Sequence, residues 1–166
     1  MANASPQALA FVAARHLCYF RPGFYVRQLV QSGTGLRSWL FAAIKMNVPM
    51  FPVTPDLEGP VREATAALER ALSPQIRDHL ARVVSKLIQS GAALDLKRWV
   101  QGVDLTADRV GFDLSHDLET AVEIVRASDE SSSSLSPQSR LKDLVLYAIS
   151  EPYFRLRERL KISVDH

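Results

Sequence analysis

The chain has 166 residues and a formal net charge of +2, from 20 basic and 18 acidic side chains, and 47% of its residues are hydrophobic. A chain of this length buries roughly two-thirds of the surface that its unfolded form exposes, so a hydrophobic core is expected and global disorder is excluded. The small net charge argues against nucleic-acid binding, which requires a basic excess gathered on one face.

The pattern of cysteine and of apolar residues indicates a cytoplasmic protein. Cys18 is the only cysteine, which excludes an intramolecular disulfide and is typical of a reducing compartment. The apolar run over residues 8–14 has no basic leading segment and is followed by Arg15 and His16, so it does not resemble a signal peptide. No window approaches the roughly 20 uninterrupted apolar residues of a membrane-spanning helix, and we expect no membrane span.

Apolar residues recur at helical spacing in the first half of the chain, and hairpin signals are missing. Ser5 followed by a proline predicts a capped helix over residues 6–20, which the following Arg-Pro-Gly ends. A short helix over 24–31 and a third over 36–48 come next. Four prolines punctuate residues 48–60, which predicts an ordered connector within the domain.

The second half repeats the same signals. The clearest helix covers 74–90, where a Ser-Pro start precedes an apolar stripe and Gly91 marks the end. Four consecutive serines within 128–136 predict a loop, because such a segment buries too little apolar area to offset its ordering entropy. Further helices are predicted over residues 57–72, 96–114, 116–127, 137–148 and 153–162.

Together these elements predict an all-α fold. We expect a single compact domain over residues 1–166 that contains about seven to nine helices.

Motifs for common catalytic chemistry are missing. The histidines are His16, His79, His116 and His166, and no two are four residues apart, so the helical pair that binds a catalytic metal is absent. The sequence has no Gly-rich phosphate loop, no Gly-x-Ser-x-Gly turn and no CxxC pair. We therefore expect no cofactor, no metal and no catalytic residue.

One pair of acids stands out. Asp104 and Asp108 are four residues apart and would share one face of a helix, where two like charges repel unless a cation lies between them. The run Thr-Ala-Asp-Arg-Val-Gly around Asp108 resembles the second motif of gluzincin metallopeptidases of the CAAX-prenyl-protease and heat-shock-protease kind. In that family, an HExxH helix supplies two zinc-binding histidines and a general base, and a later ExxxD motif supplies the third ligand and a supporting acid.

The resemblance implies the fold of that family and argues against its activity. The first motif falls on Arg15, His16 and Tyr19, where the family has histidine, glutamate and histidine. Asp104 stands at the position of the third ligand, and Asp108 at that of the supporting acid. The implied site is a remnant of the zinc site. In it, Arg15 supplies the positive charge that zinc supplied in the family, and Arg15 pairs with Asp104 or Asp108 in a polar centre. The chain also resembles the C-terminal region of long bacterial tetratricopeptide-type proteins, which implies that it is one domain of a longer chain.

Three functions follow from these observations. The first is a noncatalytic protein-binding or scaffold module, a pseudoenzyme whose likeliest contact segments are residues 48–60 and 128–136. The alternative is a divergent metal-dependent hydrolase that uses Asp104 and Asp108 with His16 and one further histidine, His79 or His116. The weaker alternative is nucleic-acid binding through scattered basic residues, namely Arg21, Arg27, Arg37 and Lys45.

Overall fold

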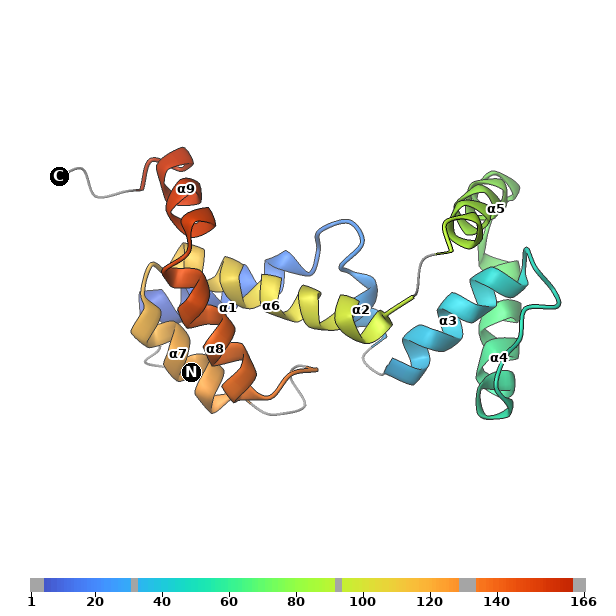
Figure 1. Cartoon of the computed structure of the whole chain (residues 1–166), viewed down its shortest axis with the longest axis horizontal. Coiled ribbons are helices and arrows are strands. Elements are labelled where there is room, and N and C mark those ends of the chain that lie inside the picture. The colour runs from blue at the N-terminus through green and yellow to red at the C-terminus, as the bar shows by residue number, and fades with distance from the viewer. Residues whose placement is uncertain (1–4, 31–32, 92–93, 129–133, 163–166) are drawn as a thin grey trace. The chain divides into compact units, whose positions relative to one another are not determined.

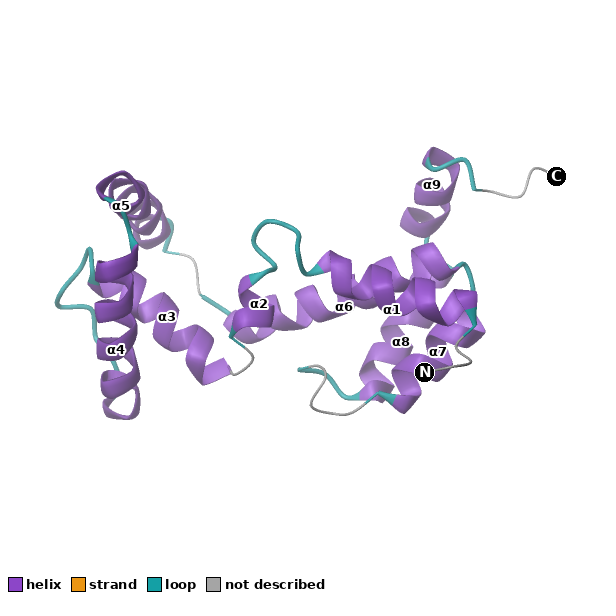
Figure 2. Cartoon of the chain, turned by 180° about the vertical axis from the view of Figure 1, so that it is seen from behind, coloured by secondary structure: helices purple, strands orange, loops and turns teal. Residues whose placement is uncertain are grey.

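The computed structural model describes residues 5–30, 33–91, 94–128 and 134–162. These residues form nine helices and no strand (Figures 1 and 2). The prediction of an all-α fold is therefore confirmed. The helices are α1 (Pro6–Cys18), α2 (Val26–Leu29), α3 (Gly33–Lys45), α4 (Pro55–Ala71), α5 (Pro74–Gln89), α6 (Leu96–Ser115), α7 (Leu118–Ala127), α8 (Pro137–Ala148) and α9 (Glu151–Arg159). Within the described residues, no helix is long and apolar enough to span a membrane.

Side-chain caps explain why most helices begin where the sequence predicts. A polar side chain before the helix accepts a hydrogen bond from the backbone N–H three residues later, which satisfies one of the donors that a helix start leaves without a partner. The caps are Ser5 for α1, Ser73 for α5, Asp117 for α7, Ser136 for α8 and Ser150 for α9. A proline follows within two residues of each cap serine, where its missing N–H costs nothing.

The Pro-rich connector is shorter than predicted. Residues 55–60 belong to α4, so the prediction of a connector over 48–60 is wrong for its second half. Pro55 occupies the first turn of the helix, where no N–H donor is needed, and Thr54 before it is extended. Pro60 lies inside the helix, where the buried Leu57 and Val61 anchor both sides of it in the core. Tertiary packing outweighs the local cost of this proline.

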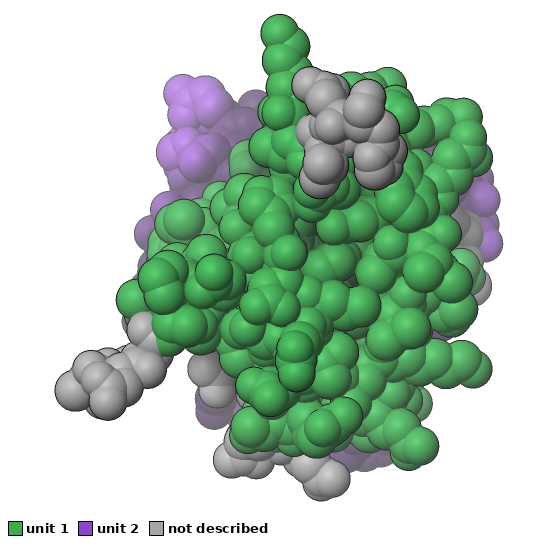
Figure 3. Space-filling view, turned by 90° about the vertical axis from the view of Figure 1, so that its left-hand side faces the viewer, with its two compact units in different colours: residues 1–28, 97–166 green, residues 29–96 purple. Residues whose placement is uncertain are grey.

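The chain divides into two compact units, Met1–Gln28 with Lys97–His166, and Leu29–Leu96. Figure 3 shows them in different colours. The single domain expected over residues 1–166 stays a prediction.

The second unit contains α3, α4 and α5, and its core lies between α3 and α4. Leu57, Val61, Ala64 and Leu68 follow helical spacing along α4, and they pack with Ala42 of α3. This periodicity is the stripe that the sequence predicts for an amphipathic helix.

In the first unit, residues of α1, α6, α7, α8 and α9 pack together in a hydrophobic cluster. Its buried members are Phe11, Phe112, Ala121, Val125, Leu144 and Tyr153. Phe11 of α1 lies directly against α6. A Cβ atom added at Gly111 would lie only 2.9 Å from the ring of Phe11. The missing side chain at Gly111 therefore sets how closely α1 and α6 approach.

Two glycines in the same helix test this packing. We expect Gly111→Ala to lower the free energy of unfolding by about 1 to 3 kcal/mol, because the new methyl group overlaps the ring and backbone of Phe11. Gly102→Ala should instead raise it by about 0.5 to 1 kcal/mol, because that position is open and alanine favours a helix. Urea unfolding followed by circular dichroism measures both changes. Equal effects at the two positions would contradict the packing role of Gly111.

Candidate functional site

Asp104 and Asp108 lie in the interior of the first unit. Both residues are on α6, and both are 0% exposed. Isolated carboxylates in such surroundings are strongly disfavoured, so each one requires charged or hydrogen-bonding partners. The pair is the centre of a polar cluster that we call the acid-pair cluster, which comprises Asp104, Asp108, Arg15, Tyr19, Arg27, Arg140, Ser128 and Ser134.

Asp108 is held between two arginines. Arg15 donates from Nε to Oδ1 of Asp108 at 2.8 Å. Arg140 donates from Nε to Oδ2 at 2.7 Å and from Nη2 to Oδ1 at 2.8 Å, which is the bidentate geometry of strong guanidinium–carboxylate pairs. The predicted pairing of Arg15 with one acid of the pair is therefore confirmed.

Asp104 has a different set of donors. Tyr19 donates its hydroxyl to Oδ1 at 3.3 Å, and Arg27 donates from Nη2 to Oδ2 at 3.4 Å. Ser134 donates both its backbone N–H and its hydroxyl to Oδ2, at 2.9 and 3.1 Å. The described end of the Ser-rich segment is therefore fixed to the buried acid.

Helix geometry aligns the two pairs. Arg15 and Tyr19 are four residues apart on the chain, as Asp104 and Asp108 are, so each pair lies on one helical face. Arg15 contacts the later acid and Tyr19 the earlier one, so the two segments run antiparallel. Two contacts one helical turn apart fix the register of α1 against α6.

Arg140 connects the cluster to α7 and α8. It is 2% exposed, and its Nη1 donates to the hydroxyl of Ser128 at 2.7 Å, directly after α7. Both described edges of the predicted loop over 128–136 therefore contact this cluster, through Ser128 and Ser134. Residues 129–133 lie outside the described residues.

The electrostatics of the cluster shift the pKa of two of its groups, Arg15 and Tyr19. Burial lowers the pKa of Arg15, but the neighbouring Tyr19 and the Asp108 carboxylate outweigh it, and the pKa lies above its ordinary value. Burial also raises the pKa of Tyr19 to about 12, against the effect of Arg15. Tyr19 therefore remains a neutral hydrogen-bond donor at neutral pH.

The other candidate residues are not part of this cluster. His16 is exposed, and its Nδ1 lies 2.8 Å from the backbone oxygen of Val12. Since a helix turns by about 100° per residue, the neighbour of Arg15 points to another side. His116 contacts Arg157 of α9, and His79 lies in the second unit. Among the described residues, no group of three or more His, Cys, Asp or Glu side chains could hold a metal ion.

Sequence reasoning missed four members of the cluster: Arg27, Ser128, Ser134 and Arg140. One signal existed for Arg140, because it precedes the buried Leu144 by four residues and so occupies the apolar face of α8. An arginine on such a face requires a buried anion. No local sequence pattern marks Arg27, Ser128 or Ser134 as partners of the acids.

A second polar group lies further along α6. Arg109 makes a bidentate pair with Asp143 of α8, at 2.9 and 2.6 Å, and Tyr147 donates its hydroxyl to Asp113. Burial raises the pKa of Asp113 to about 6, although the hydrogen bond from Tyr147 and the attraction of Arg109 and Arg157 act in the opposite direction.

Comparison of the chain with protein-family models, with curated proteins and with solved structures finds no match. The resemblance to gluzincin peptidases therefore rests on the sequence pattern alone.

The two ion pairs on α6 should differ in their contribution to stability. We expect Asp108→Asn to lower the free energy of unfolding by about 3 to 5 kcal/mol, because it leaves Arg140 buried without its counter-charge. Asp143→Asn is the matched control and should cost at most about 1 kcal/mol, because Arg109 is partly exposed. Urea unfolding measures both values. A small effect at Asp108 would show that the cluster does not stabilise the fold.

Asp113 should make stability depend on pH. Its pKa is about 6 in the folded protein, above the value of about 3.9 for an unfolded chain, so the folded state binds the proton more tightly. Stability from this group is therefore greatest in acid and is lost as pH rises through about 4 to 6. Relative to wild type, Asp113→Asn should gain roughly 2 kcal/mol across that window. The measurement is the difference between their urea unfolding free energies, and a difference that stays constant with pH would contradict it.

Proposed function

We propose that this protein is a noncatalytic protein-binding or scaffold module. The observation that carries the proposal is the state of the acid pair. Asp104 and Asp108 are fully buried and accept hydrogen bonds from side chains of the fold itself. A carboxylate that acts as a general base or binds a catalytic metal must reach water or substrate. The arrangement fits a structural role, in which the acids fix helices in place.

The proposal extends to the origin of the site. Arg15 occupies the position where the peptidase pattern has its first zinc-binding histidine, and its Nε lies 2.8 Å from Asp108. We propose that this cation replaces the charge of a lost metal. The short distance and the burial of Asp108 support the substitution.

The outward face of α1 supports a protein partner. Leu9, Val12, Leu17 and Phe20 are all exposed, and Leu17 and Phe20 each reach 66%. Leu9, Val12 and Leu17 belong to α1, Phe20 follows its end, and the ring of Phe20 contacts that of Tyr25 at a centroid distance of 5.5 Å. We propose that they form an apolar surface of the kind that marks sites of protein association. We call this set the α1 outer face and place the partner there, in addition to the segments 48–54 and 128–136.

A binding experiment tests the proposal. The wild-type protein, used as bait in an extract of the cells that express it, should retain a reproducible set of proteins. The double variant Leu17→Ser with Phe20→Ser should lose them, because it removes apolar area from the α1 outer face. The matched control is Ile76→Ser with Val83→Ser, which changes two exposed residues of α5 and should retain them. Unfolding midpoints verify that all three proteins are folded.

Metal analysis tests the opposing interpretation as a hydrolase. We expect the purified protein to contain no stoichiometric zinc after dialysis. Stoichiometric zinc, together with hydrolytic activity that is lost in chelator and in Asp104→Asn, would overturn the proposal. If the α1 outer-face variant retained all partners, the α1 outer face would not be the partner-binding surface.

A further inference from the structure

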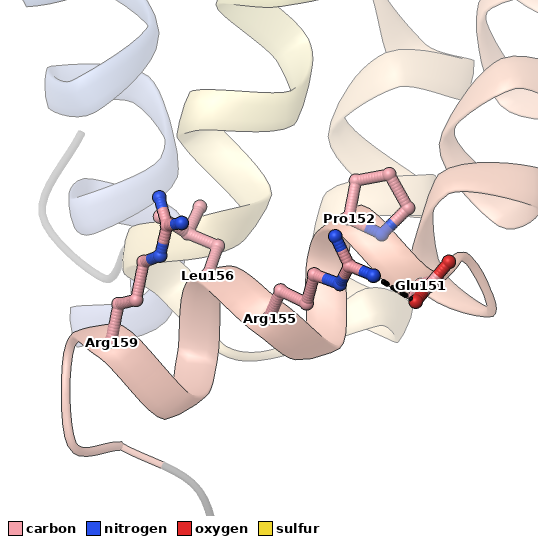
Figure 4. Close-up of a pocket in the computed structure, with 5 residues that line it drawn as sticks. All are labelled: Glu151, Pro152, Arg155, Leu156 and Arg159. Carbon is pink, nitrogen blue, oxygen red and sulfur yellow. Dashed lines mark hydrogen bonds and ion pairs between the residues drawn. The ribbon is translucent and has the colours of Figure 1, made fainter.

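Helix α9 is attached to the first unit through one of its faces. Tyr153 is buried and stacks on Phe112 of α6, with ring centroids 4.9 Å apart. Arg157 lies one turn later and donates to the Tyr153 hydroxyl at 3.1 Å. On the other side of α9, Arg155 pairs with Glu151, and Pro152, Leu156 and Arg159 complete the lining of a shallow pocket (Figure 4). The attachment therefore depends on Tyr153 and Arg157.

Arg157 connects α9 to the turn between α6 and α7. Its Nη1 lies 3.1 Å from Nδ1 of His116, and its Nη2 donates to the backbone oxygen of Ile162 at 2.6 Å. An arginine can only donate hydrogen bonds, so Nδ1 of His116 must carry no proton. The contact requires the neutral imidazole with its proton on Nε2.

The backbone holds His116 in place for this contact. Its φ is 53°, the left-handed conformation, and its N–H donates to the backbone oxygen of Phe112 at 3.0 Å. Among residues with a side chain, asparagine, aspartate and histidine adopt this conformation most readily. A short, well-defined turn therefore presents the imidazole to Arg157.

We propose that His116 is a pH-sensitive latch for α9. Protonation of the imidazole removes the acceptor for Arg157 and leaves two cations 3.1 Å apart. The attraction becomes a repulsion, α9 loosens from the turn between α6 and α7, and the Arg157 contact with Ile162 is disturbed with it. Histidine is the side chain that ordinarily changes its charge between about pH 5 and 8, so the test below compares the two ends of this range.

The charged and titratable groups around the latch come from three helices and the α6–α7 turn. They are Arg109 and Asp113 of α6, Asp117 next to His116, Asp143 and Tyr147 of α8, and Tyr153 and Arg157 of α9. Asp113 acts in the opposite direction to His116, because burial raises its pKa and acid therefore favours its buried form. The two effects are separable by substitution at His116 alone.

Hydrogen exchange tests the latch in the full chain. The protection factors of the α9 amides, corrected for intrinsic exchange and normalised to those of α8, should fall about two- to fivefold from about pH 7.5 to pH 5, because the contact between His116 and Arg157 is exposed to solvent. In His116→Asn the normalised protection should not fall. Asparagine tolerates the left-handed backbone, and its side-chain oxygen accepts a hydrogen bond at every pH.

Two further variants make the result decisive. His79→Asn replaces an exposed histidine of α5 and should keep the wild-type pH dependence. Arg157→Met removes the donor, so α9 protection should be low at both pH values. The proposal is overturned if α9 protection in wild type does not change with pH, or if it falls equally in His116→Asn.

Discussion

The first unit depends on one buried interaction, the carboxylate of Asp108 between the guanidinium groups of Arg15 and Arg140. Removing these charges from water costs several kcal/mol per ion, and the cost is offset only when the geometry is close to ideal. Because the three residues belong to α1, α6 and α8, those helices must take one arrangement for the charges to meet. The bidentate contact from Arg140 has little tolerance for displacement.

Hydrophobic packing and the charge cluster act on the same helix. Along α6, Gly111 and Phe112 contact the apolar cluster, and Asp104 and Asp108 hold the charges. Apolar contact alone tolerates sliding, whereas paired charges and the close approach at Gly111 do not. We infer that the cluster specifies the register of α1 against α6. The carboxylate oxygens of Asp104 and Asp108 accept hydrogen bonds from within the fold. We therefore assign partner binding to the outer surface.

Permanent and titratable charges occupy different parts of the unit. The acid-pair cluster contains arginines and a tyrosine whose pKa is raised to about 12, so its donors keep their protons across the physiological range. Toward the end of α6, burial raises the pKa of Asp113 to about 6, so this carboxyl group can change its charge near neutral pH. Fixed charges suit a structural centre, and titratable ones suit the attachment of a terminal helix such as α9.

The sequence by itself determined the local features of this protein. Ser-Pro pairs placed the helix starts, apolar spacing placed the helices, and the four-residue interval put Asp104 and Asp108 on one face. The peptidase resemblance also suggested Arg15 as a partner. Only the tertiary structure decided that Arg140 and Ser134 complete the site, that α4 begins as early as Pro55, and that His16 points away from the acids. Helical periodicity depends on residues that are close together in the sequence. The outcomes above depend instead on contacts and packing between distant segments, as for Arg15 and Asp108, which are 93 residues apart.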